Sequence, residues 1–190
     1  MEKSNFVYHG SSHQNLKKIY KNKSTHGNSW VYGTFSKAIA TIFISNLGND
    51  LYYYLKGDGT KDNPVILVER KKDMFSKIFN MDGSLYTLNK KNFIDGKTGW
   101  SAEVVSEFDE EVIHEEYIKN IFNKLKELNN SGEIMLFLYP ERPNYIPKDN
   151  SDLIPKVINW KKRGLNIDKF FEIYPELEEQ FLIELQNQEE

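Results

Sequence analysis

Short apolar runs with the β-strand pattern recur along the first two-thirds of the chain. Some alternate apolar and polar residues, others are continuously apolar as in buried strands, and turn-forming residues lie at their ends. The pattern predicts strands over residues 5–10, 29–34, 64–70, 84–94 (as one strand or a pair), 102–108 and 134–143. Residues 110–118 continue the β-type pattern before it becomes helical, and Tyr52, Tyr53 and Tyr54 are expected to be core and rim aromatics.

Two segments among these strands have helical periodicity instead. Residues 36–46 place apolar side chains on one side of a helix, with Ser36 as its N-cap. The clearest helix lies within residues 115–132, where Gly132 follows its end as a stop signal. Its apolar stripe is expected to be core and consists of Tyr117, Ile118, Ile121, Phe122, Leu125 and Leu128.

The character of the chain changes to helices beyond about residue 148. Helical patterns cover residues 150–164, 166–175 and 175–188 and end in a polar tail. We therefore expect a main domain over residues 1–148 and a helical C-terminal appendage over residues 149–190 packed on it. Mixed strands with inserted and appended helices make the predicted fold class α+β.

The composition narrows the classes of protein to which the chain can belong. It has 190 residues, enough for one ordinary domain with an appendage, and no cysteine, which excludes disulfides, thiol catalysis and cysteine-ligated metal centres. A net charge of −3 gives no strong signal for nucleic-acid binding. No window reaches the ~20 apolar residues that span a bilayer, and the N-terminus lacks a signal-peptide segment, so we expect a cytoplasmic protein without a membrane partner.

Most common catalytic and metal-binding motifs are missing from the sequence. The four histidines form no HExxH pair, so no metal site is expected. The absence of GxSxG, P-loop and GxGxxG motifs excludes the common hydrolases, NTPases and Rossmann enzymes. Three features remain, in chain order: YHGS at residues 8–11, VYGT at 31–34 leading into the helical segment, and WSAEVVSEF at 100–108.

In this order, the three features resemble the ADP-ribosyltransferase-like superfamily, in particular its His–Tyr–Glu branch. That branch includes poly-ADP-ribose polymerases, diphtheria-type toxins and, with an aspartate in third place, rifampicin-modifying transferases. The first two motifs look most like the rifampicin-modifying group, and residues 102–113 are similar to the polymerase pattern of a glutamate followed by alternating apolar residues. The resemblance covers residues 6–118 and implies a split β-sheet core with inserted helices.

The resemblance also implies roles for individual residues in binding NAD. His9 would hydrogen-bond the adenosine ribose, with Ser11 beside it, and Gly10 would let the backbone approach the nicotinamide carboxamide, where a side chain would interfere. Tyr32 would lie flat against the nicotinamide ring. Glu103 would bind the nicotinamide-ribose hydroxyl and place negative charge near the oxocarbenium-like cation that forms when the nicotinamide leaves.

Several assignments stay open at the level of sequence. Glu107 lies four residues beyond Glu103, on the same face of a strand, and is the alternative third residue. Ser24 and His26 precede the tyrosine strand and could contact a ribose or phosphate, or only shape a loop. His9 and Tyr32 each have a structural interpretation as well, a satisfied histidine at a strand end and a core aromatic.

The implied function is NAD-dependent mono-ADP-ribosyl transfer, with NAD as a substrate, to an acceptor that the sequence does not identify (protein, nucleic acid or small molecule). Two alternatives stay open: a non-catalytic nucleotide- or partner-binding module on the same fold, and an enzyme similar to RNA 2′-phosphotransferase. An antitoxin, paired with a toxin role, and a second copy in a homodimer remain candidate partners.

Overall fold

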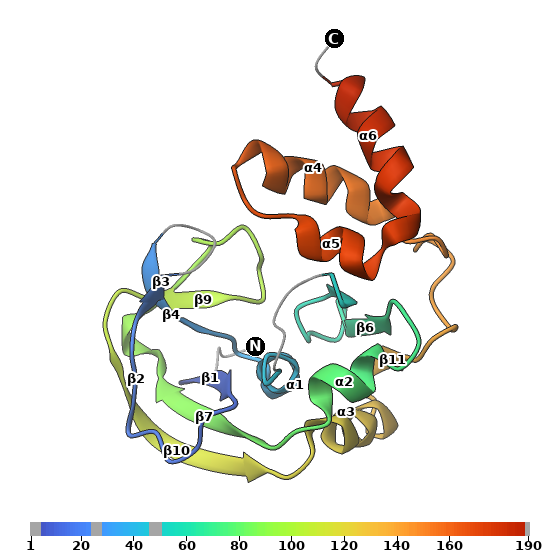
Figure 1. The fold of residues 1–190 in the computed structure, drawn as a ribbon. Helices are drawn as coiled ribbons and strands as arrows, with labels where there is room; N and C mark the ends of the chain where they lie inside the picture. Colours follow the sequence, from blue (N-terminus) through green and yellow to red (C-terminus); the bar gives the residue numbers. More distant parts are fainter. Residues whose placement is uncertain (1–4, 24–27, 46–50, 189–190) are drawn as a thin grey trace. The chain divides into compact units, whose positions relative to one another are not determined.

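A computed structural model describes residues 5–23, 28–45 and 51–188 of the chain, and its fold class is α+β (Figure 1). The chain divides into two compact units, Met1–Pro140 and Glu141–Glu190. The boundary lies earlier than the expected one at residue 148, because Arg142 donates hydrogen bonds to the Pro147 carbonyl (2.7 Å) and Asn150 Oδ1 (3.1 Å). These bonds join the segment after Pro140 to the second unit.

The first sheet of unit 1 carries the histidine motif on one of its edge strands. Its order is β1 (Phe6–Ser11), β7 (Gly83–Asn89), β10 (Glu110–Ile118) and β2 (Lys18–Ile19), and every pairing is antiparallel. Figure 1 shows β7 and β10 running side by side below β1 and α1. A bulge interrupts the β10–β7 register between Val112 and His114.

The second sheet carries the tyrosine motif and also the strand that directly follows Glu103. Its order is β3 (Asn22–Lys23), β4 (Ser29–Gly33), β9 (Val104–Ser106) and β8 (Phe93–Asp95), again antiparallel. A single bridge joins it to β1, with hydrogen bonds of 2.8 and 3.0 Å between the backbones of Tyr8 and Thr34.

Apolar side chains from both sheets form one core around this junction. The cluster consists of Val7, Ile19, Val31, Tyr86, Leu88, Phe93 and Val104, all buried. Burial of such side chains contributes about 1.5–3 kcal/mol each to folding, so β1, β4, β7 and β9 are held together firmly. The predicted strands of this region are confirmed, with residues 84–94 forming the strand pair β7 and β8, joined by the 3₁₀ helix η1 (Lys90–Asn92).

A third sheet has the order β11 (Ile134–Phe137), β6 (Val65–Glu69) and β5 (Tyr53–Lys56), with β11 parallel to β6. Strand β5 and helix α2 (Met74–Phe79) were not predicted. The buried Glu69 carboxylate accepts hydrogen bonds from the backbone N–H groups of Phe75 (2.8 Å) and Tyr139 (2.9 Å). It thereby satisfies a donor in the first turn of α2, which has no side-chain cap of its own.

Two further helices of unit 1 correspond to the predicted ones, with one correction. Helix α1 (Lys37–Ile42) begins after Ser36, whose hydroxyl accepts the Ile39 N–H at 3.3 Å, as expected for an N-cap. Helix α3 (Ile121–Asn130) begins later than predicted, because Tyr117 and Ile118 belong to β10. The expectation that the whole stripe is core is therefore wrong for Tyr117, which is 52% exposed.

Unit 2 is helical, as predicted for the C-terminal segment. It contains η2 (Ser151–Leu153), α4 (Ile154–Lys162), α5 (Asp168–Ile173), η3 (Pro175–Leu177) and α6 (Glu178–Gln186). Its own core comprises the buried residues Leu153, Ile154, Val157, Ile158, Phe170, Tyr174, Leu177 and Phe181. That this segment packs on the main body stays a prediction.

Candidate functional site

The structure connects His9 and Tyr32, the first two residues of the expected trio, by a hydrogen bond. His9 on β1 places Nδ1 2.8 Å from the backbone carbonyl oxygen of Tyr32 on β4. Because a carbonyl can only accept, Nδ1 must carry the hydrogen and donate it. In the neutral ring the other nitrogen, Nε2, is then a hydrogen-bond acceptor, and it has no partner among the described residues.

The protonation state of His9 follows from its surroundings. Burial lowers the pKa of His9 below its ordinary value, since desolvation disfavours the charged ring, and the hydrogen bond to Tyr32 opposes this only in part. The imidazole is therefore neutral at neutral pH. A neutral ring with a fixed Nδ1–H can accept a hydrogen bond from a ligand hydroxyl at Nε2.

Tyr32 lies on the strand between the histidine and the glutamates. Its side chain is half-buried, and its ring lies 6.1 Å from that of Trp30 at an interplanar angle of 60°. In the β4–β9 register Tyr32 faces Val105, so the two residues share a face of the sheet. This position presents the ring beside the segment that carries Glu103 and Glu107.

The two candidate glutamates flank β9 on either side. Glu103 is half-buried directly before the strand, in a turn where its N–H donates to the Trp100 carbonyl at 3.1 Å, whereas Glu107 is exposed directly after it. Each lies two residues from Val105 in the sequence, so both share the face of Val105. Since Gly33 pairs with Val104, Glu103 lies at the end of β4 where Thr34 bridges to β1, and Glu107 lies at the opposite end. The topology therefore places Glu103, rather than Glu107, nearest to the histidine strand.

Packing, rather than a ligand, accounts for the glycine of the first motif. A Cβ on Gly10 would lie 1.9 Å from the Ala40 carbonyl oxygen in α1 and 2.8 Å from Ile44 Cγ1. A side chain at residue 10 would therefore meet the helix before it met nicotinamide, which corrects the physical reason expected for this glycine.

The remaining expected contact residues are accounted for as follows. Ser11 ends β1, and its Oγ accepts the His13 N–H at 3.1 Å, which shapes the turn that follows. Ser24 and His26 lie outside the described residues.

Sequence reasoning missed a polar network centred on Glu115 of β10. Its Oε1 accepts hydrogen bonds from Ser84 Oγ (2.6 Å) and the Asn15 N–H (2.9 Å), and Tyr86 Oη lies at 3.1 Å. The hydrogen bond from Ser84, followed by that from Asn15, lowers the pKa of Glu115, so the carboxylate is ionised at neutral pH. In the sequence Glu115 is one of several charged residues of an alternating run, and nothing local distinguishes it.

An open depression of about 420 Å³ lies beside this network. It is lined by Gln14, Asn15, Glu115 and Tyr117. The Tyr117 hydroxyl donates to the Asp82 carboxylate, which fixes the ring. Two of the four lining residues belong to the segment that directly follows the His9–Gly10–Ser11 motif.

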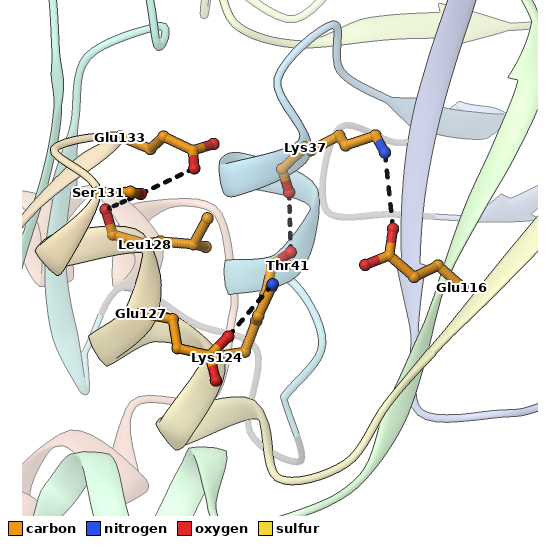
Figure 2. Close-up of polar contacts among 8 residues, drawn as sticks. All are labelled: Lys37, Thr41, Glu116, Lys124, Glu127, Leu128, Ser131 and Glu133. Carbon is orange, nitrogen blue, oxygen red and sulfur yellow. Dashed lines mark hydrogen bonds and ion pairs between the residues drawn. The ribbon is translucent and has the colours of Figure 1, made fainter.

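The opposite face of β10 contacts α1 through charged groups (Figure 2). Lys37 Nζ, at the start of α1, lies 3.6 Å from a Glu116 carboxylate oxygen and 5.4 Å from the centre of the Tyr8 ring. In the nearby α3, Lys124 pairs with Glu127 at 3.3 Å, and a depression of about 190 Å³ is lined partly by these side chains. The side chains of Glu115 and Glu116 thus lie on opposite faces of β10.

Among the described residues, no group of three or more histidine, aspartate and glutamate side chains is placed to hold a metal ion. Within the same ranges, no helix has the length and apolar character needed to cross a membrane. No family model matches the sequence, and no curated protein and no solved structure is significantly similar to the chain.

Proposed function

We propose that the protein is an NAD-dependent mono-ADP-ribosyltransferase with a split-sheet core of the expected type. The observation that carries the proposal is the hydrogen bond between His9 and Tyr32, which joins two of the three motifs that resemble the family. The third motif enters on the next strand, since β9 pairs with β4. The three motifs therefore lie on three adjacent strands, although long stretches of chain separate them.

The spacing of these strands suits a dinucleotide. At the Tyr8–Thr34 bridge, where β1 and β4 lie side by side, neighbouring strands are about 4.8 Å apart, so the backbones of β1 and β9 are separated by about 10 Å at that point. In the proposed binding mode His9 Nε2 accepts a hydrogen bond from a hydroxyl of the adenosine ribose, and Glu103 binds the nicotinamide ribose. A ligand with two riboses can then bridge the junction between the two sheets.

The proposed chemistry uses the charge of Glu103. The bond between ribose C1′ and the nicotinamide nitrogen breaks, its electron pair leaves with nicotinamide, and positive charge develops on the ribose. A carboxylate held close to that ribose stabilises the cation. The acceptor nucleophile then bonds to C1′ and loses its proton.

The test is nicotinamide release from NAD by the purified protein. We expect Glu103→Gln to lower kcat about 100- to 1,000-fold, the usual cost of removing one preorganised electrostatic group. Glu107→Gln is expected to retain most of the activity, and Glu111→Gln, which removes an exposed partner of Lys18, serves as the control.

The outcomes separate the proposal from its alternatives. Loss of activity in Glu107→Gln instead of Glu103→Gln would move the catalytic role to Glu107. Binding of NAD in calorimetry without turnover would favour a nucleotide-binding module, and turnover only with 2′-phosphorylated RNA would favour the phosphotransferase-like alternative. The absence of both NAD binding and nicotinamide release would overturn the proposal.

A further inference from the structure

The segment between β1 and β2, residues 12–17, continues directly from the His9–Gly10–Ser11 motif. Strands β1 and β2 are the two edges of the first sheet, with β7 and β10 between them. The segment must therefore cross both central strands to reach β2. We call it the crossover segment.

Side chains from the two central strands hold the crossover segment by its backbone. The Glu115 carboxylate binds the Asn15 N–H with both oxygens, at 2.9 and 3.2 Å, where Asn15 has a φ of 60°. The Tyr86 hydroxyl donates to the His13 carbonyl at 2.8 Å and accepts the Leu16 N–H at 3.3 Å. Of these anchors, only Glu115 is charged, and hydrogen bonds to charged groups are the stronger kind.

Strand register connects these anchors to the first motif. His9 pairs with Tyr86 across β1 and β7, and Tyr86 pairs with Glu115 across β7 and β10. Directly paired residues point to the same face, so one row of three side chains runs from the motif histidine to Glu115. Ser84 donates to Glu115 at 2.6 Å and steadies the end of that row.

We propose that Glu115 is a positioning residue that fixes the crossover segment for NAD binding. The inference rests on the proposed function, because it takes His9 and Ser11 as the binding point of the adenosine half of NAD. The crossover segment begins at that point. Since the adenosine half does not react, its contacts are equal in the ground state and the transition state, and losing them raises KM and leaves kcat unchanged.

The test compares Glu115→Gln with Glu116→Gln in the full chain. The neighbouring Glu116 faces α1 and pairs with Lys37, so its variant changes charge equally without touching the crossover segment. We expect Glu115→Gln to speed hydrogen exchange at the Asn15 amide and to raise the Kd and KM for NAD about tenfold, the weight of one hydrogen bond to a charged group. The value of kcat should stay within about twofold.

Ser84→Ala is a second variant that removes one donor to Glu115 and keeps the carboxylate. We expect it to speed exchange at the Asn15 amide and to weaken NAD affinity by smaller factors than Glu115→Gln does. In both measurements Glu115→Asp is expected to lie between Glu115→Gln and the unsubstituted protein. Unchanged exchange at Asn15 in Glu115→Gln would overturn the inference whether or not the protein binds NAD.

Two further results would also overturn it. Faster exchange with unchanged NAD affinity would do so while leaving the proposed function intact. A loss of kcat in Glu115→Gln as large as its rise in KM would do so as well. Failure of the unsubstituted protein to bind NAD would refute the proposed function and the role of Glu115 in NAD binding together, and the exchange data would then report only the anchoring of the segment.

Discussion

Gly10 and His9 are adjacent in the chain, yet different parts of the structure determine what each can do. The Cβ direction of Gly10 is filled by the Ala40 carbonyl and the Ile44 side chain, so the glycine permits close contact between α1 and β1. The ring of His9 is fixed instead by the Tyr32 carbonyl. The sequence motif thus combines one residue explained by packing with one whose second ring nitrogen, Nε2, has no hydrogen-bond partner among the described residues.

The Gly10→Ala substitution is expected to destabilise the protein by about 1–3 kcal/mol, the usual cost of overpacking a core. The added methyl group would collide with helix backbone, which cannot move aside as a flexible side chain can. Urea unfolding monitored by circular dichroism would measure the change. Ser11→Ala, one residue further along β1, is the control, and equal stability of both variants would contradict the packing argument.

At the scale of secondary structure, the chain between β10 and α3 explains why the predicted helix began too early. Tyr117 and Ile118 fit a helical stripe with Ile121, but in the structure they belong to β10 and pair with β7. Asn120 then breaks the strand with a φ of 58°, and its side chain accepts the Asn123 N–H at 2.9 Å as the N-cap of α3. An asparagine just before an apolar helical repeat was the local signal that could have located this boundary.

Helix α1 offers a test of local capping. Ser36→Ala removes the hydroxyl that accepts the Ile39 N–H, and we expect a loss of about 1 kcal/mol in the free energy of unfolding. The exposed Ser12→Ala is the control and should leave stability unchanged. A Ser36→Ala protein as stable as the unsubstituted one would show that packing of α1 on β1, rather than its cap, determines the stability of the helix.

At the scale of the whole molecule, the meeting of two sheets creates the surroundings of His9. Its ring is half-buried and hydrogen-bonded to the neighbouring strand β4 because β1 and β4 come together at the Tyr8–Thr34 bridge. The same junction brings Glu103 within two strands of His9. Stability and the proposed NAD site therefore depend on the same contact between sheets.

Burial of His9 predicts a pH dependence of stability. Its pKa is lowered in the folded state, so the unfolded chain binds more protons once the pH falls below about 6.5, the ordinary value. The contribution of neutral His9 is complete above that pH and decreases as the pH falls toward the lowered pKa. Thermal unfolding between pH 7.5 and 5 should show a smaller decrease for His9→Asn than for the unsubstituted protein, and parallel curves would contradict this assignment.

The sequence by itself determined most individual strands, the position and N-cap of α1, the helical C-terminal segment and the three motifs, because alternation, capping and turn residues are local properties of the chain. It could not locate β5 or α2. Strand β5 lies in an aromatic cluster that suits core or rim equally well, and α2 has only six residues and follows the charged residues 70–73. Strand order was decided only by the tertiary structure, since pairings between residues as distant as His9 and Tyr86, or Tyr32 and Val105, depend on burying a shared core. The same physical reason hid Glu115, whose partners come from two separate segments, the crossover segment and β7, and meet it only when the sheet forms.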